Sequence, residues 1–217
     1  MYEITILFSF HMQNGRCNPS ELFRIIEKIS PEVIFEELPL YVFEEIYAEG
    51  NNPKTVEATT IKEYHKIYQV EHVPVDTYEK NLTDLFEGFD LIGEKNNEYI
   101  KLLNQQMEMI SREGYAFLNS TDFDELMDEI HFIEENFLSE VNDNKLTNQY
   151  LAEKEMHLNR DNEMIRNIYN YSKLNRFNKA LFLCGAEHRK SIVKLISQYE
   201  EREGFKLNWK FYKSENF

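Results

Sequence analysis

The chain has 217 residues, of which 42% are hydrophobic, and its 24 basic and 39 acidic side chains give a formal net charge of −15. A chain of this length can bury a full core, and no stretch has the composition of a linker, so we expect one α/β domain over residues 1–217 with a helical insertion at about 82–174. The acidic balance repels a phosphate backbone, which argues against nucleic acid as a partner.

Neither membrane insertion nor export is indicated. No apolar run approaches the ~18 residues that a membrane-spanning helix needs, and the first residues lack the basic start of a secretory leader. The two cysteines, Cys17 and Cys184, are too few for a disulfide framework. The sequence therefore predicts a cytoplasmic protein with reduced thiols and no membrane partner.

Strand and helix signals alternate in the first part of the chain. Residues 4–10, 33–37 and 70–75 read as buried strands. Asn18 followed by a proline predicts the start of a helix that ends before Pro31, and a second helix is expected at about 55–68. The expected buried face of that second helix carries Ile61, Tyr64, Ile67 and Tyr68. Strands separated by helices at these spacings predict right-handed crossovers and a mainly parallel sheet.

Only helical periodicity is found between about 82 and 174. The apolar stripes of two expected helices are Tyr99, Leu103, Met107 and Ile110, and then Phe123, Leu126, Met127, Ile130, Ile133 and Phe137. The acidic run at 122–135 is expected to be a solvated helix face. A third helix at about 150–174 is predicted to bury Leu151, Leu158, Ile165 and Ile168. Asp161 falls on that stripe, with Arg160 about 100° round the helix.

The last part of the chain returns to the sheet. Residues 180–184 form an apolar run that ends in Gly185, and a helical pattern follows. A strand that passes through a glycine turn into a helix places the next polar side chains at the mouth of the sheet. Residues 207–211 alternate and predict an edge strand.

Polar side chains stand at the ends of four predicted strands: His11, Glu37, Asp76 and His188. Parallel strands share one carboxyl edge, so we expect His11, Glu37 and His188 to meet in one cleft within about 8 Å of one another. Two imidazoles and a carboxylate suit Zn²⁺, Mn²⁺ or Co²⁺ with a position left for water. They equally suit metal-free hydrolysis, in which one histidine takes a proton from water and a carboxylate fixes its tautomer.

The other polar candidates are less clearly placed. A buried Asp161 requires a partner, which is either a neighbouring side chain or a site. The remaining histidines are expected on the surface or on helices; they are His65, His72, His131 and His157.

Four short segments resemble family motifs. They are Phe-Ser-Phe-His at 8–11, Pro-Glu-Val-Ile-Phe-Glu-Glu-Leu at 31–38, Asn-Arg-Asp-Asn-Glu-Met at 159–164 and Gly-Ala-Glu-His at 185–188. In order and spacing the chain resembles the superfamily that joins TraB, GumN and Tiki proteins with erythromycin esterases and haem-binding ChaN proteins. Two positions depart from the family pattern, since Phe8 and Glu187 stand where glycines are expected.

The resemblance implies a function and a set of site residues. It implies an erythromycin-esterase-like or ChaN-like α/β fold, with the helical insertion over the carboxyl edge of the sheet, and a hydrolase acting on a peptide, amide or ester bond of a small molecule or peptide. His11, Glu37 and His188 would hold a divalent metal (Mn, Co or Zn), and Arg160 would steady the oxyanion. Glu187 would be a general base or an extra ligand, with Asp76 and Asp161 as secondary candidates.

Three alternatives remain open. In a metal-free enzyme His11 activates water and Glu37 orients it. A non-catalytic protein of the ChaN type would bind haem or another planar ligand. The third alternative is an inactive regulatory member of the family, which is favoured by Phe8 at the position of a motif glycine.

Overall fold

The computed structural model, which describes residues 2–77 and 86–213, has an α/β architecture built on one five-stranded sheet. The strands are β1 (Glu3–Ser9), β2 (Val33–Pro39), β3 (Glu71–Asp76), β4 (Lys179–Gly185) and β5 (Asn208–Phe211). Their spatial order is β3-β2-β4-β1-β5 and every pairing is parallel. The predicted parallel sheet is confirmed, and β5 lies at an edge as its alternation indicates.

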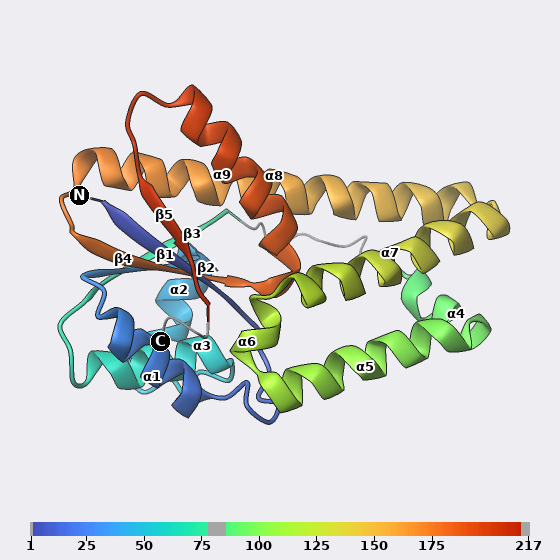
Figure 1. The fold of residues 1–217 in the computed structure, drawn as a ribbon, viewed down its shortest axis with the longest axis horizontal. Helices are drawn as coiled ribbons and strands as arrows, with labels where there is room; N and C mark the ends of the chain where they lie inside the picture. The colour runs from blue at the N-terminus through green and yellow to red at the C-terminus, as the bar shows by residue number, and fades with distance from the viewer. Residues whose placement is uncertain (1, 78–85, 214–217) are drawn as a thin grey trace.

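Helices cover both faces of the sheet. They are α1 (Pro19–Ile29), α2 (Leu40–Ile46), α3 (Val56–His65), α4 (Gly88–Lys95), α5 (Asn97–Glu113), α6 (Tyr115–Leu118), α7 (Thr121–Val141), α8 (Asn144–Leu174) and α9 (Arg189–Arg202), with the short 3₁₀ turn η1 (Ala186–His188) before α9. Helices α1 to α3 lie on one face, and α9 with the C-terminal half of α8 lies on the other (Figure 1).

The rest of the helical segment forms an arm that projects past the carboxyl ends of the strands. Figure 1 shows α4, α5, α7 and the N-terminal half of α8 side by side in this arm. The predicted insertion is helical from residue 88 to 174, and its expected start at 82 falls outside the described residues. None of the helices in the described ranges is long and apolar enough to span a membrane.

Local sequence signals explain the start of α1. The side chain of Asn18 accepts a hydrogen bond from the backbone N–H of Glu21, and Pro19 occupies the first helical position, where its missing N–H costs nothing. Leu22 and Ile26 are fully buried against the sheet. At the other end Ser30 adopts the left-handed conformation that ends the helix.

Some helix predictions are wrong about where a helix lies or about which of its residues are buried. Helices α2 and α4 were not predicted, and α2 buries none of its residues, so it has no apolar stripe to reveal it. Helix α8 begins at Asn144 rather than near 150. Leu151 and Leu158 are 56% and 49% exposed although the stripe predicts them buried. Their half of α8 lies in the projecting arm, away from the sheet against which Ile165 and Ile168 pack.

Burial differs from expectation at other positions as well. Ile67 and Tyr68 lie beyond the end of α3, and Ile67 is exposed. Met107 is exposed too. Within the acidic run most carboxylates are exposed as predicted, but Glu134 is buried and accepts hydrogen bonds from the hydroxyls of Tyr99 and Tyr150. Both cysteines are buried and unpaired, in agreement with the sequence.

Candidate functional site

The strand register brings three predicted site residues together around Gly185. Ser9 at the end of β1 pairs with Gly185 at the end of β4, and Glu37 continues β2 on the other side of β4. A Cβ atom placed on Gly185 would lie 3.2 Å from Glu37 Oε2, 3.6 Å from His188 Cδ2 and 3.8 Å from His11 Nε2. The carboxyl edge therefore carries His11, Glu37 and His188 in one place, and Gly185 leaves room for their side chains.

Glu37 is the hub of this group. Its Oε2 accepts the backbone N–H of Gly185 at 2.6 Å, while its Oε1 lies 2.8 Å from Arg160 Nη2 and 3.0 Å from His188 Nε2. Burial by itself would raise the pKa of Glu37. The charge of His188, the hydrogen bonds from His188 and Gly185 and the charge of Arg160 outweigh burial and hold that pKa well below its usual range.

His188 is bonded to a carboxylate at each ring nitrogen. Nδ1 is hydrogen-bonded to the buried Asp161, and Nε2 faces Glu37. Although burial opposes the charged form, Glu37 and Asp161 raise the pKa of His188 to about 10. Arg160 continues the series, because its guanidinium also binds Asp76 at the end of β3. Asp161, His188, Glu37, Arg160 and Asp76 thus form a chain of alternating charge in which each ion has an opposite neighbour.

His11 pairs with a residue that sequence reasoning missed. Its Nδ1 lies 3.2 Å from Oε1 of Glu57, in the first turn of α3, and Ser9 Oγ donates to the same oxygen at 2.6 Å. The side chain of Glu57 is 6% exposed, whereas that of His11 is 58% exposed. Acidic residues are common in the first turn of a helix because they interact favourably with the positive end of the helix dipole. The sequence therefore did not distinguish Glu57 from any other acidic residue in a first turn. The hydrogen bond to Glu57 and the charge of that carboxylate raise the pKa of His11 to about 9, although partial desolvation of the ring opposes the shift.

A cavity of about 330 Å³ lies at this edge, and we call it the strand-end cavity. Its polar wall includes Ser9, His11, Glu37, Glu57, Asp76 and Arg160. Its apolar wall includes Leu38, Pro39, Val42, Ile46 and Leu183. A small carbonyl compound placed here would contact His11 and an apolar surface at once.

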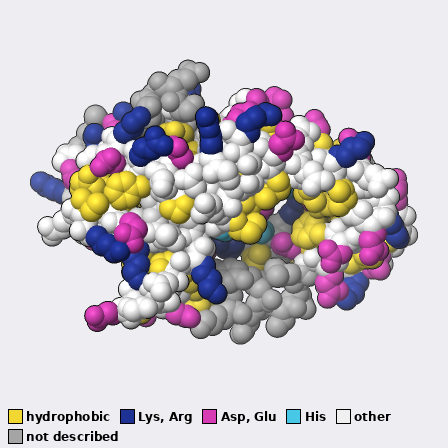
Figure 2. Space-filling model, turned by 90° about the horizontal axis from the view of Figure 1, so that it is seen from below, with side chains coloured by type: hydrophobic (Ala, Val, Ile, Leu, Met, Phe, Trp, Pro, Cys, Tyr) yellow, Lys and Arg dark blue, Asp and Glu magenta, His cyan; other side chains and the backbone are white. Residues whose placement is uncertain are grey.

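A second cavity, which we call the arm cavity, has a volume of about 600 Å³ and is lined from the arm by Phe89, Tyr99, Leu103, Tyr150 and Leu158, among others. His188, Asp161 and Glu187 lie at its wall. Glu187 is exposed there and lines this cavity rather than the strand-end cavity. Figure 2 shows a hollow between the sheet and the arm, with a histidine side chain in its depth.

Of the remaining histidines, His72 differs from expectation, and His157 agrees with it but lies at a cavity wall. His157 is on a helix as predicted, but its ring lies 5.3 Å from that of His188, in the wall of the arm cavity. His72 is neither a surface nor a helix histidine, because its buried side chain lies on β3 and is hydrogen-bonded to Glu36 at 2.8 Å. His72 lies in a short strand that contains a proline, and nothing in the sequence around it indicates a carboxylate partner.

The donor set does not fit the metal centre that the family resemblance implies. A metal ligand must offer the lone pair of a neutral ring nitrogen, and both nitrogens of His188 are engaged with carboxylates. Arg160 already supplies the cation beside Glu37. Among the described residues no group of three histidine, cysteine or acidic side chains is placed to hold a metal ion.

Phe8 does not distort the site. It lies within β1, opposite Cys184 of β4, and its ring is 1% exposed. The side chain of Asn119 bonds both its backbone N–H and its carbonyl. The strand therefore delivers His11 to the edge without the glycine that the family pattern contains.

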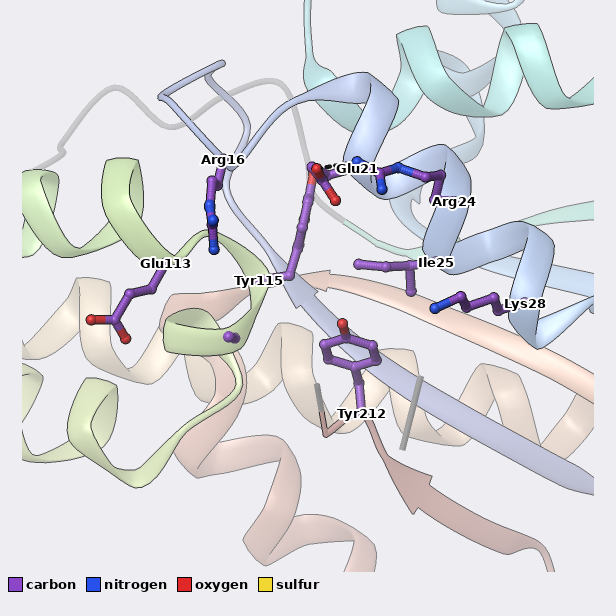
Figure 3. Close-up of a pocket in the computed structure, with 9 residues that line it drawn as sticks. Arg16, Glu21, Arg24, Ile25, Lys28, Glu113, Tyr115 and Tyr212 are labelled. Atoms are coloured by element: carbon purple, nitrogen blue, oxygen red, sulfur yellow. Dashed lines mark hydrogen bonds and ion pairs between the residues drawn. The ribbon is translucent and has the colours of Figure 1, made fainter. Parts of the chain in front are cut away.

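A third pocket lies away from these residues. Figure 3 shows it between α1, the junction of α5 and α6, and Tyr212, with a volume of about 290 Å³. Arg16, Arg24 and Lys28 contribute positive charge, and Arg24 is paired with Glu21. None of the predicted site residues lines it.

Comparisons of the chain with family models, with curated proteins and with solved structures find no match.

The alternating charges from Asp161 to Asp76 predict that the stability of the fold depends on pH. The pKa of His188 is higher in the folded chain than its ordinary value of 6.5. The stabilisation that protonated His188 contributes to the folded state is therefore complete below about pH 6.5, and it is lost as the pH rises through about 10. We expect the free energy of unfolding, measured with urea, to fall between about pH 7 and 9. In His188→Asn this fall should be shallower; an equally steep fall would contradict the assignment of the charge to His188.

Proposed function

We propose that this chain is a hydrolase that cleaves an ester or amide bond, peptide bonds included, at the strand-end cavity and without a metal ion on His188. The observation that carries the proposal is the His11–Glu57 pair, in which a buried carboxylate holds an exposed imidazole at the mouth of a cavity. An imidazole oriented by a carboxylate is a common general base in hydrolysis.

The chain's own groups support a simple proton path. The acceptor Glu57 favours the hydrogen on Nδ1 of His11, which leaves Nε2 near Gly185 as the basic atom. Neutral Nε2 would take a proton from water as the water oxygen attacks the carbonyl carbon, and would return the proton to the leaving oxygen or nitrogen. Arg160 lines the cavity and supplies positive charge near the carbonyl oxygen, where negative charge develops. Glu57, not Glu37, therefore takes the orienting role.

A substrate screen with and without a chelator tests this proposal. Purified protein should hydrolyse at least one p-nitrophenyl ester, anilide or short peptide, and EDTA should leave the rate unchanged. Activity that EDTA removes and Mn²⁺, Co²⁺ or Zn²⁺ restores would favour the metal-dependent alternative. Failure to hydrolyse any member of the three substrate classes would overturn the proposal.

The pKa of His11 makes a further prediction about the rate. Because only neutral His11 accepts a proton and its pKa is raised to about 9, kcat/KM should rise with pH up to about 9 and then level off. The pH profile of the free enzyme's kcat/KM measures this directly. A profile that falls across the same range would show that protonated His11 acts as an acid instead.

A second candidate is a non-catalytic binding protein of the ChaN type. The volume of the arm cavity and its aromatic wall, next to His157 and His188, favour it. A haem absorbance spectrum that shifts on addition of the protein, together with no turnover of any substrate class, would support this candidate over the hydrolase.

A further inference from the structure

We propose that the substrate carries a large apolar substituent and that this substituent occupies the arm cavity while the scissile carbonyl lies at His11. This inference rests on the proposed function, because it names the class of substrate that the same site would take.

The walls of the arm cavity are suited to an apolar group. Its volume of about 600 Å³ is nearly twice the 330 Å³ of the strand-end cavity, and four helices of the arm contribute aromatic and aliphatic side chains to it. Phe89 comes from α4, Leu103 from α5, Ile130 from α7 and Leu158 from α8. Burial of apolar surface is the main source of affinity for such a ligand.

Two of the polar groups in this wall are already satisfied by the protein. Glu134 accepts the hydroxyls of Tyr99 and Tyr150, and Lys154 pairs with Glu135 while lying over the ring of Tyr150. Burial also lowers the pKa of His157, so that this ring is neutral. Of the other polar groups in the wall, the Glu187 carboxylate is exposed, and the buried Ser191 Oγ has no hydrogen-bond partner among the described residues. Most of the surface that a neutral apolar group would meet is rings and methyl groups.

Exposed apolar side chains mark the same cavity. Phe89 is 39% exposed and Leu158 is 49% exposed, and both line it. Apolar side chains gathered at a cavity, without cover from the described part of the protein, are typical of a ligand site.

His188 lies between the arm cavity and the strand-end cavity. Its ring lines the arm cavity, and its Nε2 lies 3.0 Å from Glu37, which lines the strand-end cavity. A Cβ atom on Gly185 would lie 3.6 Å from His188 Cδ2 and 3.8 Å from His11 Nε2, so the missing side chain leaves room between the two rings. A substrate whose apolar part fills the arm cavity would reach His11 by passing over Gly185.

Two leucines of α8 provide a matched pair of variants. Leu151 and Leu158 are both exposed, and only Leu158 lines the arm cavity. We expect kcat/KM for p-nitrophenyl octanoate to exceed that for the acetate by ~50-fold or more, and Leu158→Trp to lower this ratio by ~10-fold. Leu151→Trp should leave the ratio unchanged. Equal rates on the two esters, or equal effects of the two variants, would overturn the inference and leave the proposed function standing.

A binding measurement separates the inference from catalysis. Octan-1-ol, titrated by calorimetry, should bind the unmodified protein and Leu151→Trp equally and bind Leu158→Trp ~10-fold more weakly. If no ester or amide is hydrolysed but this difference is found, the proposed function fails and the apolar site is supported. If octan-1-ol binds both variants equally or binds neither, the inference is overturned.

Discussion

Replacing His11 by asparagine should lower kcat/KM by ~10³-fold, because general acid–base catalysis by a positioned histidine contributes on that order. The structure identifies Glu57 as its partner, so Glu57→Gln should also reduce the rate, by ~10²-fold, and the double variant should be little worse than His11→Asn alone. Steady-state kinetics on the best substrate from the screen measures all three.

The control for this cycle lies on the same helix. Glu63 of α3 is exposed and pairs with Lys66 at the surface, so Glu63→Gln should leave kcat/KM unchanged. If the losses of the two single variants, expressed as activation free energies, add fully in the double variant, His11 and Glu57 do not act as a unit.

Replacing Arg160 by alanine should lower the free energy of unfolding by ~3–5 kcal/mol, because among the described residues it leaves the buried Asp76 without a cation and leaves Glu37 with His188 only. The side chains of Glu37 and Asp76 are 7% and 1% exposed, and each bonds Arg160 at 2.8 Å. Urea titration monitored by circular dichroism would measure the loss.

Arg166 provides the comparison for Arg160. It lies six residues further along α8 and is exposed, with an ion pair to Glu163 in the same helix, so Arg166→Ala should cost ~0.5 kcal/mol or less. Similar losses in the two variants would contradict the buried charge chain.

Local sequence patterns determined the sheet and the placement of its polar ends. Apolar runs that end in His11, Glu37, Asp76 and His188 alternate with helical stretches, and helical crossovers make such strands parallel. Parallel strands end at the same edge, so the meeting of His11, Glu37 and His188 followed from chain order and strand direction alone. Gly185 was visible for the same reason, as the residue at which an apolar run gives way to a helix.

Side-chain partners across the fold were decided by the tertiary structure. Glu57 is an ordinary first-turn acid in the sequence, and it becomes the partner of His11 only because α3 packs beside the end of β1. The sequence left Asp161 either to a neighbour or to a site, and the structure supplies both, since its partner is His188. The alternation of charge from Asp161 to Asp76 joins two strands and two helical segments, and periodicity contains no information on such contacts.

The tertiary structure also decided which part of the apolar face of α8 is buried. Periodicity places Leu151, Leu158, Ile165 and Ile168 on one stripe, but only the half of α8 that packs on the sheet buries that stripe. A stripe shows which side chains share a face, and burial requires another element opposite that face. For Ile165 and Ile168 the sheet is that element, whereas Leu158 is left beside the arm cavity.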